Sequence, residues 1–265
     1  MDHRPRKRFG QNFLHDRGVI ERIVRAIRPQ SDQHMVEIGP GLGALTEHLV
    51  DAVQRLDVVE LDRDLVPRLQ ERFGDRNHFL IHNADALRFD FAALAQPGEK
   101  LRVVGNLPYN ISTPLLFHLL EQHSAIRDMH FMLQLEVVDR LAAQPGDDDY
   151  GRLSVMIQYH CQVDKLFTVP PGAFTPPPKV YSAIVRLRPH DTPPYPARDA
   201  KMFERVVAQA FSQRRKTLRN TLKGLLDASA IEALGIDGSR RPETLSLAEF
   251  VALADAAYQH APDIA

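Results

Sequence analysis

A glycine-rich stretch that follows an apolar run decides the fold, and it reads Glu37-Ile38-Gly39-Pro40-Gly41-Leu42-Gly43-Ala44. The apolar run that leads into it, Met35–Ile38, has the length and composition of a buried strand. Gly39 and Gly41 allow the backbone to turn tightly and to approach a ligand closely. The stretch therefore predicts a strand–loop–helix unit with a nucleotide pocket at the turn.

Apolar runs of strand length alternate with helical patterns on both sides of this stretch. A helical pattern such as Leu65–Phe73 separates each run from the next. Strands that alternate with helices form a parallel sheet with helices on both faces. The predicted parallel strands are Met35–Ile38, Leu56–Leu61, Phe79–His82, Leu101–Gly105 and His130–Leu133.

Two further strand-like runs, Val163–Val169 and Ala183–Leu187, flank a proline-rich loop. Because no helical pattern separates them, they predict an antiparallel hairpin at the edge of the sheet, which then has seven strands. Prolines in residues 189–196 predict a stiff linker. Residues 199–265 show helical spacing and no strand pattern. We therefore expect an α/β domain over residues 1–190 and a small all-helical domain over residues 199–265.

The composition is that of a globular protein, with 44% hydrophobic and 25% charged residues in a chain of 265. A single cysteine, Cys161, excludes an intramolecular disulfide and a cysteine-cluster zinc site. The histidines show no zinc spacing, and no apolar run has the length of a membrane span. We expect a cytoplasmic monomer with no metal and no membrane partner.

Acidic residues at strand ends indicate which nucleotide the pocket holds. Glu60 lies 21 residues after Gly39, where a carboxylate can accept hydrogen bonds from ribose hydroxyls. The same glycines fit a dinucleotide fingerprint, so a dehydrogenase is an alternative, as is a turn without a ligand. Glu37 and Asp85 favour S-adenosylmethionine, because a carboxylate repels a pyrophosphate and can accept from amino groups. Asp85 can also cap a helix that begins before Leu87, which is compatible with ligand binding.

The tetrapeptide Asn106-Leu107-Pro108-Tyr109 follows a predicted strand at the edge where parallel sheets bind ligands. The Asn106 side-chain carbonyl and a main-chain carbonyl just before or at Pro108 can accept both protons of an exocyclic amine. This orients the nitrogen towards a methyl sulfonium, and such positioning is worth several kcal/mol, up to ~7–11. Tyr109 can stack on a base. The motif predicts amine methylation without a metal, and a turn that merely ends the strand is the alternative.

Phe174 lies within the proline-rich loop of residues 170–179. A loop with so many prolines is preorganised, and an aromatic side chain held there can form the second face of a sandwich around a flipped-out base. A hydrophobic plug beneath the loop accounts for the same residue equally well.

Basic residues gather in two segments although the net charge is only −1. Residues 1–28 hold eight basic and three acidic residues, and residues 201–223 hold seven basic and one acidic. The two segments predict one polyanion-binding face, with two solvated helix faces as the alternative.

Taken together, the motifs resemble those of the ribosomal RNA adenine dimethyltransferase family, and in particular its bacterial small-subunit branch. The resemblance implies a class I, Rossmann-like methyltransferase fold, S-adenosylmethionine as methyl donor, and 16S rRNA within the small (30S) subunit as partner. It also implies dimethylation of two adjacent adenosines near the 3′ end of that RNA. The segments that carry it are Lys7–Leu14, Glu37–Thr46, Glu60–Asp62, Asn106–Thr113, Phe174–Ala183 and Phe211–Leu218.

The resemblance also implies roles for individual residues. A lid over the cofactor is formed by Asn12 and Leu14, and the cofactor is further bound by Gly39, Gly41, Glu60, Asp85 and Asn106. Methyl transfer is assigned to Asn106, Leu107, Pro108 and Tyr109, with Phe174 as the aromatic partner of the adenine. The basic segments become an RNA grip made of Arg6, Lys7, Arg8, Arg214, Arg215, Lys216, Arg219 and Lys223.

Two other functions on the same fold stay open from the sequence. One is a large-subunit (23S) rRNA dimethylase of the macrolide-resistance type, which the segments Lys7–Leu14 and Phe174–Ala183 disfavour. The other is a non-catalytic ribosome assembly or transcription factor, which the unbroken motif Asn106–Tyr109 disfavours.

Overall fold

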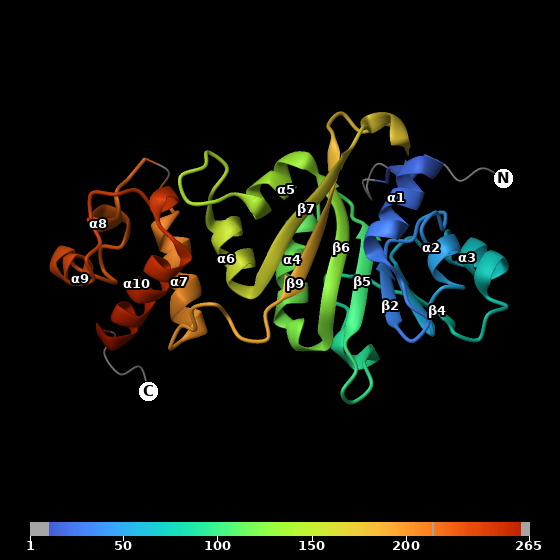
Figure 1. The fold of residues 1–265 in the computed structure, drawn as a ribbon, viewed down its shortest axis with the longest axis horizontal. Coiled ribbons are helices and arrows are strands. Elements are labelled where there is room, and N and C mark those ends of the chain that lie inside the picture. Colours follow the sequence, from blue (N-terminus) through green and yellow to red (C-terminus); the bar gives the residue numbers. More distant parts are fainter. Residues whose placement is uncertain (1–10, 214, 261–265) are drawn as a thin grey trace. The chain divides into compact units, whose positions relative to one another are not determined.

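The computed structural model describes residues 11–213 and 215–260, and these form two compact units. Unit 1 takes its described residues from Met1–Val138 and Asp164–Pro189, and unit 2 takes its own from Asp139–Val163 and His190–Ala265. A seven-stranded sheet with helices forms unit 1, whereas unit 2 is largely helical (Figure 1).

The sheet has the strand order β4-β3-β2-β5-β6-β9-β7. Five strands are parallel from β4 to β6, and β9 then runs antiparallel to β6, with β7 at the edge beside it. This confirms the predicted parallel sheet and the reversal of direction at one edge. The strands are β2 (His34–Ile38), β3 (Arg55–Glu60), β4 (Phe79–Asn83), β5 (Leu101–Asn106), β6 (Ile126–Gln134), β7 (Cys161–Val169) and β9 (Ser182–Pro189).

Helices cover the sheet because their apolar residues recur at helical spacing. In α1, Ile20, Ile23 and Ile27 form one stripe and are buried against the sheet, while Asp16 caps the helix by accepting from the Val19 amide. The helices of unit 1 are α1 (Arg17–Ile27), α2 (Thr46–Leu49), α3 (Val66–Phe73), α4 (Ser112–Glu121) and the first part of α5 (Leu135–Ala142), with 3₁₀ turns at Ala92–Leu94, His123–Ala125 and Pro171–Ala173.

A second, two-stranded sheet lies beside the large one and was not predicted. β1 (Phe13–Leu14) pairs antiparallel with β8 (Phe174–Thr175), so that Leu14 lies opposite Phe174. The main chain continues this pairing, because the His15 amide donates to the Ala173 carbonyl at 3.0 Å. The lid segment and the proline-rich loop are therefore joined by backbone hydrogen bonds.

Unit 2 encloses a core of its own. Phe203, Val206 and Val207 are buried on one face of α7, and Phe250 and Leu253 are buried on α10. Its helices are the last part of α5, α6 (Arg152–His160), α7 (Ala200–Ala210), α8 (Leu218–Thr221), α9 (Ala228–Ala233) and α10 (Leu247–His260), with a 3₁₀ turn at Pro242–Thr244.

The division of the chain differs from the predicted domain limits in one respect. Unit 1 ends at Pro189, close to the expected end of the α/β domain at residue 190. Residues 139–163, however, group with the helical unit rather than with the sheet. The reason is that α6 packs on α7, where the Tyr159 and Phe203 rings stack with centroids 4.2 Å apart. The periodicity of α6 reveals that it has an apolar face but not which partner covers that face.

A buried ion pair ties α1 to the middle of the sheet. The Arg102 guanidinium of β5 donates from Nε to both carboxylate oxygens of Asp128 in β6, at 3.0 Å each. It also donates to the main-chain carbonyls of Ile27 at 2.6 Å and Arg28 at 3.2 Å, which lie at the end of α1. Burial alone would raise the pKa of the Asp128 carboxyl, but His130 and Arg102 hold it below its usual value.

Two kinds of feature are not found in the described part of the chain. No helix in residues 11–213 and 215–260 combines the length and apolar character needed to cross a membrane. Over the same ranges, no group of three or more His, Cys, Asp or Glu residues is arranged to hold a metal ion.

Replacing Arg102 by alanine is expected to destabilise the protein by about 3–5 kcal/mol, because it leaves the Asp128 carboxylate buried without its partner. Urea unfolding measures the loss. The matched control is Arg76→Ala, which breaks an exposed pair with Asp51 and should change the free energy of unfolding far less. Equal losses in the two variants would contradict a special role for the buried pair.

Candidate functional site

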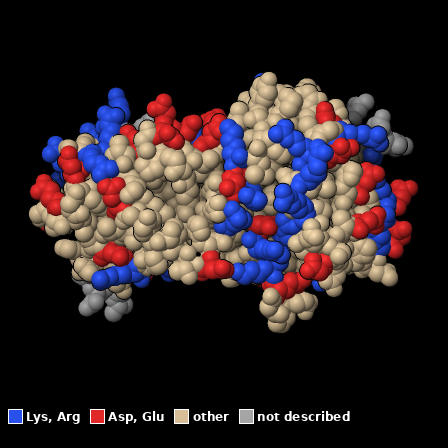
Figure 2. Space-filling view, viewed as in Figure 1, with Lys and Arg blue, Asp and Glu red and all other residues tan. Residues whose placement is uncertain are grey.

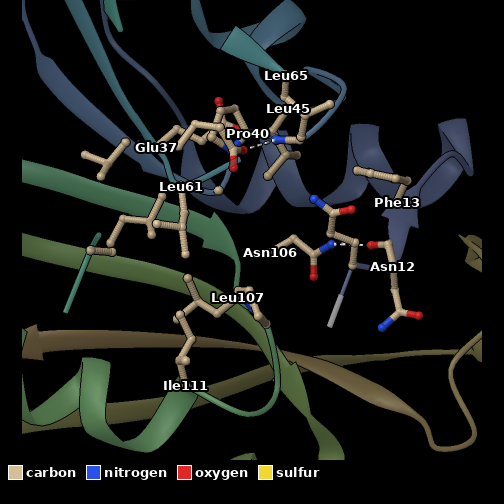
Figure 3. Close-up of a pocket in the computed structure, with 18 of the residues that line it drawn as sticks. Asn12, Phe13, Glu37, Pro40, Leu45, Leu61, Leu65, Asn106, Leu107 and Ile111 are labelled. Atoms are coloured by element: carbon tan, nitrogen blue, oxygen red, sulfur yellow. Dashed lines mark hydrogen bonds between the residues drawn. The ribbon is translucent and has the colours of Figure 1, made fainter. Parts of the chain in front are cut away.

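A cavity of about 160 Å³ lies at the carboxyl ends of the central strands of unit 1 (Figure 3). Parallel pairing brings these strand ends to one edge, because Ile38 of β2 is in register with Val59 of β3. Five segments line the cavity. The lining residues lie within 11–14, 37–45 (without Gly43), 59–61, 84–86 and 106–111, together with Leu65.

The glycine-rich loop forms one wall, and its three glycines, Gly39, Gly41 and Gly43, all have positive φ angles. Gly39 and Gly41 have φ angles of 66° and 59°, in the left-handed region that side chains disfavour. At Gly41 a Cβ atom would also come within 3.1 Å of the Phe13 ring in the lid. Phe13 of the lid segment therefore packs directly on the loop.

Glu37 supplies a buried carboxyl group at the end of β2. Its side chain is 2% exposed and accepts a hydrogen bond of 2.6 Å from the Thr46 hydroxyl. Burial raises the pKa of this carboxyl to about 7, and the neighbouring charge of Glu60 acts in the same direction, while the Thr46 bond opposes both. A cationic group that entered the cavity would stabilise the ionised form of Glu37.

Glu60 is held at the end of β3 by backbone donors. Its carboxylate accepts from the Asp62 amide at 2.8 Å and from the Gly41 amide at 3.2 Å. Burial raises its pKa, and these backbone hydrogen bonds partly offset that rise. Asp62 in turn accepts from Gln11 Nε2 at 3.0 Å, which links this corner of the cavity to the lid.

Asp85 lines the cavity at the end of β4, as predicted. One of its carboxylate oxygens accepts from the Leu87 amide at 3.0 Å. Residues 86–88 form a turn rather than a helix, so the cap expected as an alternative is present only as a turn contact.

Asn106 joins the lid to the methyl-transfer motif. Its Nδ2 donates to the main-chain carbonyl of Asn12 at 3.0 Å (Figure 3). Only the amide nitrogen can donate to a carbonyl, so this bond sets the orientation of the side chain and leaves Oδ1 as the end that can accept a proton donor. The side-chain amide is thus fixed by an interaction between residues 94 positions apart.

The next residues of the motif differ in what they can contribute. Leu107 is 1% exposed, and its amide donates to the Met132 carbonyl at 3.2 Å, which anchors the motif to β6. The Pro108 carbonyl already accepts from the Ile111 amide and the Ser112 hydroxyl, at 3.2 and 3.1 Å. Of the two main-chain carbonyls next to the proline ring, the Leu107 carbonyl is therefore the one suited to accept from a ligand.

Tyr109 is held by a residue that the sequence did not single out. Its hydroxyl lies 2.6 Å from the hydroxyl of Ser182, the first residue of β9, which is fully buried. Burial raises the pKa of the Tyr109 phenol, so it stays protonated at neutral pH. Ser182 lies within a segment that carries the family resemblance, but no local pattern marks it as a partner of Tyr109.

Phe174 does not line the cavity. Its side chain is 2% exposed and belongs to an apolar cluster with Leu14, Ala173 and Ile184. In this conformation Phe174 is the hydrophobic plug that the sequence left as an alternative. A stacking role would require its ring to leave the cluster.

The predicted RNA grip is only partly described by the structure. Arg6, Lys7, Arg8 and Arg214 lie outside the described residues. The remaining members are all exposed, in or near α8 of unit 2, and they are Arg215, Lys216, Arg219 and Lys223. Their role in RNA binding stays a prediction.

Comparison with known proteins places this site in context. A model of the ribosomal RNA adenine dimethylase family matches residues 2–259. The ribosomal RNA small subunit methyltransferase A of Pseudomonas putida is 66% identical over 253 residues, which are 96% of this chain and 95% of that protein. The protein of the same name from Chromohalobacter salexigens is 63% identical over 98% of this chain and 94% of its own length.

Two solved structures share the fold over nearly the whole chain. A dimethyladenosine transferase from Plasmodium falciparum has a TM-score of 0.78 at 25% identity, covering 91% of this chain and 95% of its own. The 23S rRNA methyltransferase ErmE has a TM-score of 0.73 at 28% identity, covering 94% of this chain and all of its own.

We expect the affinity for S-adenosylmethionine to fall as the pH drops below about 7, because protonated Glu37 no longer attracts a cation. One pH unit below that value, the contribution of Glu37 to the affinity should fall by up to about tenfold. Isothermal titration between pH 6 and 8 measures this. Glu37→Gln should bind more weakly at pH 8 and lose the dependence, whereas Glu47→Gln, at an exposed position, should keep it. If the affinity of Glu37→Gln for S-adenosylmethionine still fell with pH as in the unmodified protein, Glu37 would not be the group responsible.

Proposed function

Because the chain belongs to the ribosomal RNA adenine dimethylase family, we propose that it dimethylates the N6 amino groups of two adjacent adenosines near the 3′ end of 16S rRNA. The methyl donor is S-adenosylmethionine. The identity of 63–66% to proteins called ribosomal RNA small subunit methyltransferase A supports the small-subunit RNA as substrate. The observation that carries the chemistry is the Asn106 amide, oriented by the lid beside the cavity.

The residues of the cavity fit S-adenosylmethionine. Glu60 and Asp85 can accept from ribose hydroxyls and from an adenine amino group, and Glu37 is a buried carboxyl suited to a cationic ligand. When bound, S-adenosylmethionine supplies a methyl group on a positively charged sulfur, which is a strong electrophile. The protein therefore has to orient the acceptor amine and keep water away from it.

Two oxygens of the motif can orient the adenine amine. Asn106 Oδ1 accepts one N–H, since Nδ2 of the same side chain is already bonded to the lid. The Leu107 carbonyl accepts the other, since the Pro108 carbonyl is used by the start of α4. With both protons held, the nitrogen lone pair points out of the adenine plane towards the methyl group.

Tyr109 is placed to stack on the adenine, and its Ser182 contact restricts rotation of the ring. Base–aromatic stacking contributes about 1–3 kcal/mol. Phe174 forms the second face of the sandwich only after its ring has left the apolar cluster around Leu14. We infer that RNA binding drives this rotation, because the base supplies the apolar contact that the ring gives up.

The same site performs both transfers to each adenine. In each transfer the sulfur–methyl bond breaks as the nitrogen–methyl bond forms, and the methylated nitrogen then releases one proton to solvent. After the first transfer the amine has one N–H, which either of the two acceptor oxygens can hold. We propose that the enzyme acts as a cytoplasmic monomer on 16S rRNA within the small (30S) subunit. The basic residues at each end of the chain, with Arg215, Lys216, Arg219 and Lys223 among them, contact phosphates there.

Methyl transfer from labelled S-adenosylmethionine tests this function directly. Undermethylated small subunits, large-subunit rRNA and free adenosine are assayed in parallel, followed by nucleoside analysis. We expect dimethyladenosine in the small subunit alone. Label in large-subunit rRNA would instead assign the protein to the activity named for ErmE, and tight subunit binding without label would assign it to non-catalytic assembly.

Asn106→Ala should abolish methyl transfer, because the amine loses one of the two oxygens that orient it. RNA affinity, measured by filter binding, should stay near that of the unmodified protein. Asn106→Asp tests the orientation separately, since a carboxylate cannot donate to the Asn12 carbonyl and should also weaken cofactor binding. Turnover in Asn106→Ala within about twofold of the unmodified enzyme would rule out the mechanism.

Ser182→Ala and Tyr109→Phe each remove one half of the same hydroxyl contact. If that contact holds the Tyr109 ring for stacking, each single variant should lower kcat several-fold and the double variant should lose little more. The comparison of single and double variants in the methylation assay measures this coupling. Losses that simply multiply would show that the two hydroxyls act independently.

A further inference from the structure

Arginines gather on one surface of unit 1 away from the cavity. Figure 2 shows Lys and Arg atoms concentrated over the region where Figure 1 places α1 and the strands β6 and β7. We call this surface the arginine face and define it by Arg22, Arg25 and Arg28 at α1 and by Arg186 and Arg188 of β9. None of these five is among the residues named for the RNA grip, although Arg22, Arg25 and Arg28 lie in the basic segment of residues 1–28.

The part of the arginine face at α1 lies next to the edge strand β7 of the sheet. The Arg22 guanidinium lies 3.9 Å from the centroid of the Phe167 ring in β7. A guanidinium over the face of a ring keeps N–H groups, which lie in its own plane, available to bond to a phosphate. Arg25 follows three residues later on the exposed surface of the helix, and Arg28 ends it. The acidic residue of this helix, Glu21, is also exposed.

The part on β9 presents two arginines on one side of the strand. Arg186 and Arg188 are two residues apart and therefore point to the same face. Both reach the carboxylate of Asp164 in β7, at 3.1 and 3.4 Å. One carboxylate thus serves two guanidiniums, whose side chains remain 34% and 45% exposed. A net positive charge is left on the surface.

The acid beneath the arginine face is already neutralised. Arg186 lies opposite His130 of β6, whose Nδ1 is 3.4 Å from the Asp128 carboxylate, an ion-pair distance without hydrogen-bond geometry. That carboxylate is bonded to the buried Arg102 guanidinium. Asp128 therefore does not cancel the charge of the exposed arginines above it.

The arginine face lies within a few nucleotides' reach of the site of methyl transfer. β9 starts at Ser182, which contacts Tyr109, and a strand rises about 3.4 Å per residue, so Arg186 and Arg188 lie ~14 and ~20 Å along the strand from that contact. α1 starts at Arg17, three residues after the end of β1 in the lid. Phosphates within a few nucleotides of a bound adenine can reach this distance.

We propose that the arginine face binds the phosphodiester backbone of the RNA next to the target adenosines, and this rests on the proposed function. A guanidinium group can bind two oxygens of one phosphate at once. Such contacts suit binding to the RNA backbone, because they do not depend on the base sequence. The surface holds the RNA by shape and charge while Tyr109 takes the base.

The test is the triple variant Arg22→Gln, Arg186→Gln and Arg188→Gln, assayed at a series of KCl concentrations on undermethylated small subunits. The plot of log affinity against log salt should lose about 0.7–0.9 in slope for each phosphate contact removed, or roughly 2–3 in total. KM for the subunits should rise at least tenfold at moderate salt. kcat at saturating subunits and the affinity for S-adenosylmethionine should not change.

The matched control removes three arginines outside the arginine face, with Arg63→Gln, Arg76→Gln and Arg241→Gln. It carries the same change in net charge and should keep the slope within about one unit. Equal slopes and KM values in the two triple variants would overturn the proposal. Should the first triple variant fail to fold by circular dichroism, Arg188→Gln alone decides, with an expected slope loss of about one.

The two proposals fail in different ways. If the unmodified protein methylates no RNA, the proposed function is wrong, and the slopes from subunit binding alone still judge the arginine face. If the unmodified protein methylates the small subunit and the triple variant has the same KM and slope, the arginine face is wrong while the function stands.

Discussion

The in-register parallel pairing of β2 with β3 and β5 is the constraint on which the rest of unit 1 depends. It brings Glu37, Glu60 and Asn106 to one edge of the sheet, although 69 residues separate the first from the last. A slip of one residue in a strand would turn its carboxyl-terminal side chain to the other face. The glycine loop then closes the edge, because glycine adopts the left-handed backbone angles found at Gly39 and Gly41 without strain.

The lid links the parts of this edge that have to act together. Phe13 packs on the glycine loop, the Asn12 carbonyl orients Asn106, and Leu14 pairs with Phe174 of the proline-rich loop. Three short contacts from one segment of the chain therefore reach the cofactor cavity, the methyl-transfer motif and the aromatic residue expected to meet the base. A ligand bound beneath the lid is therefore coupled to the cavity, to the methyl-transfer motif and to Phe174.

Charge on this protein has to be judged by location rather than by its sum. A net charge of −1 gives no sign of a nucleic-acid partner. On the arginine face, however, the carboxylate of Asp164 is shared by two guanidiniums and that of Asp128 is buried with Arg102. The charge of Asp128 is balanced by the buried Arg102, and Asp164 is outnumbered by its two arginines, so a net positive charge remains on the exposed surface.

The sequence by itself determined the strand and helix pattern, the glycine loop, the motif Asn106–Tyr109 and the family, because these depend on residues close together in the chain. Only the tertiary structure decided which end of the Asn106 amide is free, that Ser182 holds Tyr109, and that Phe174 is buried. The first two depend on contacts between residues 94 and 73 positions apart. No local periodicity encodes such contacts, since they arise only when elements distant in the sequence pack together.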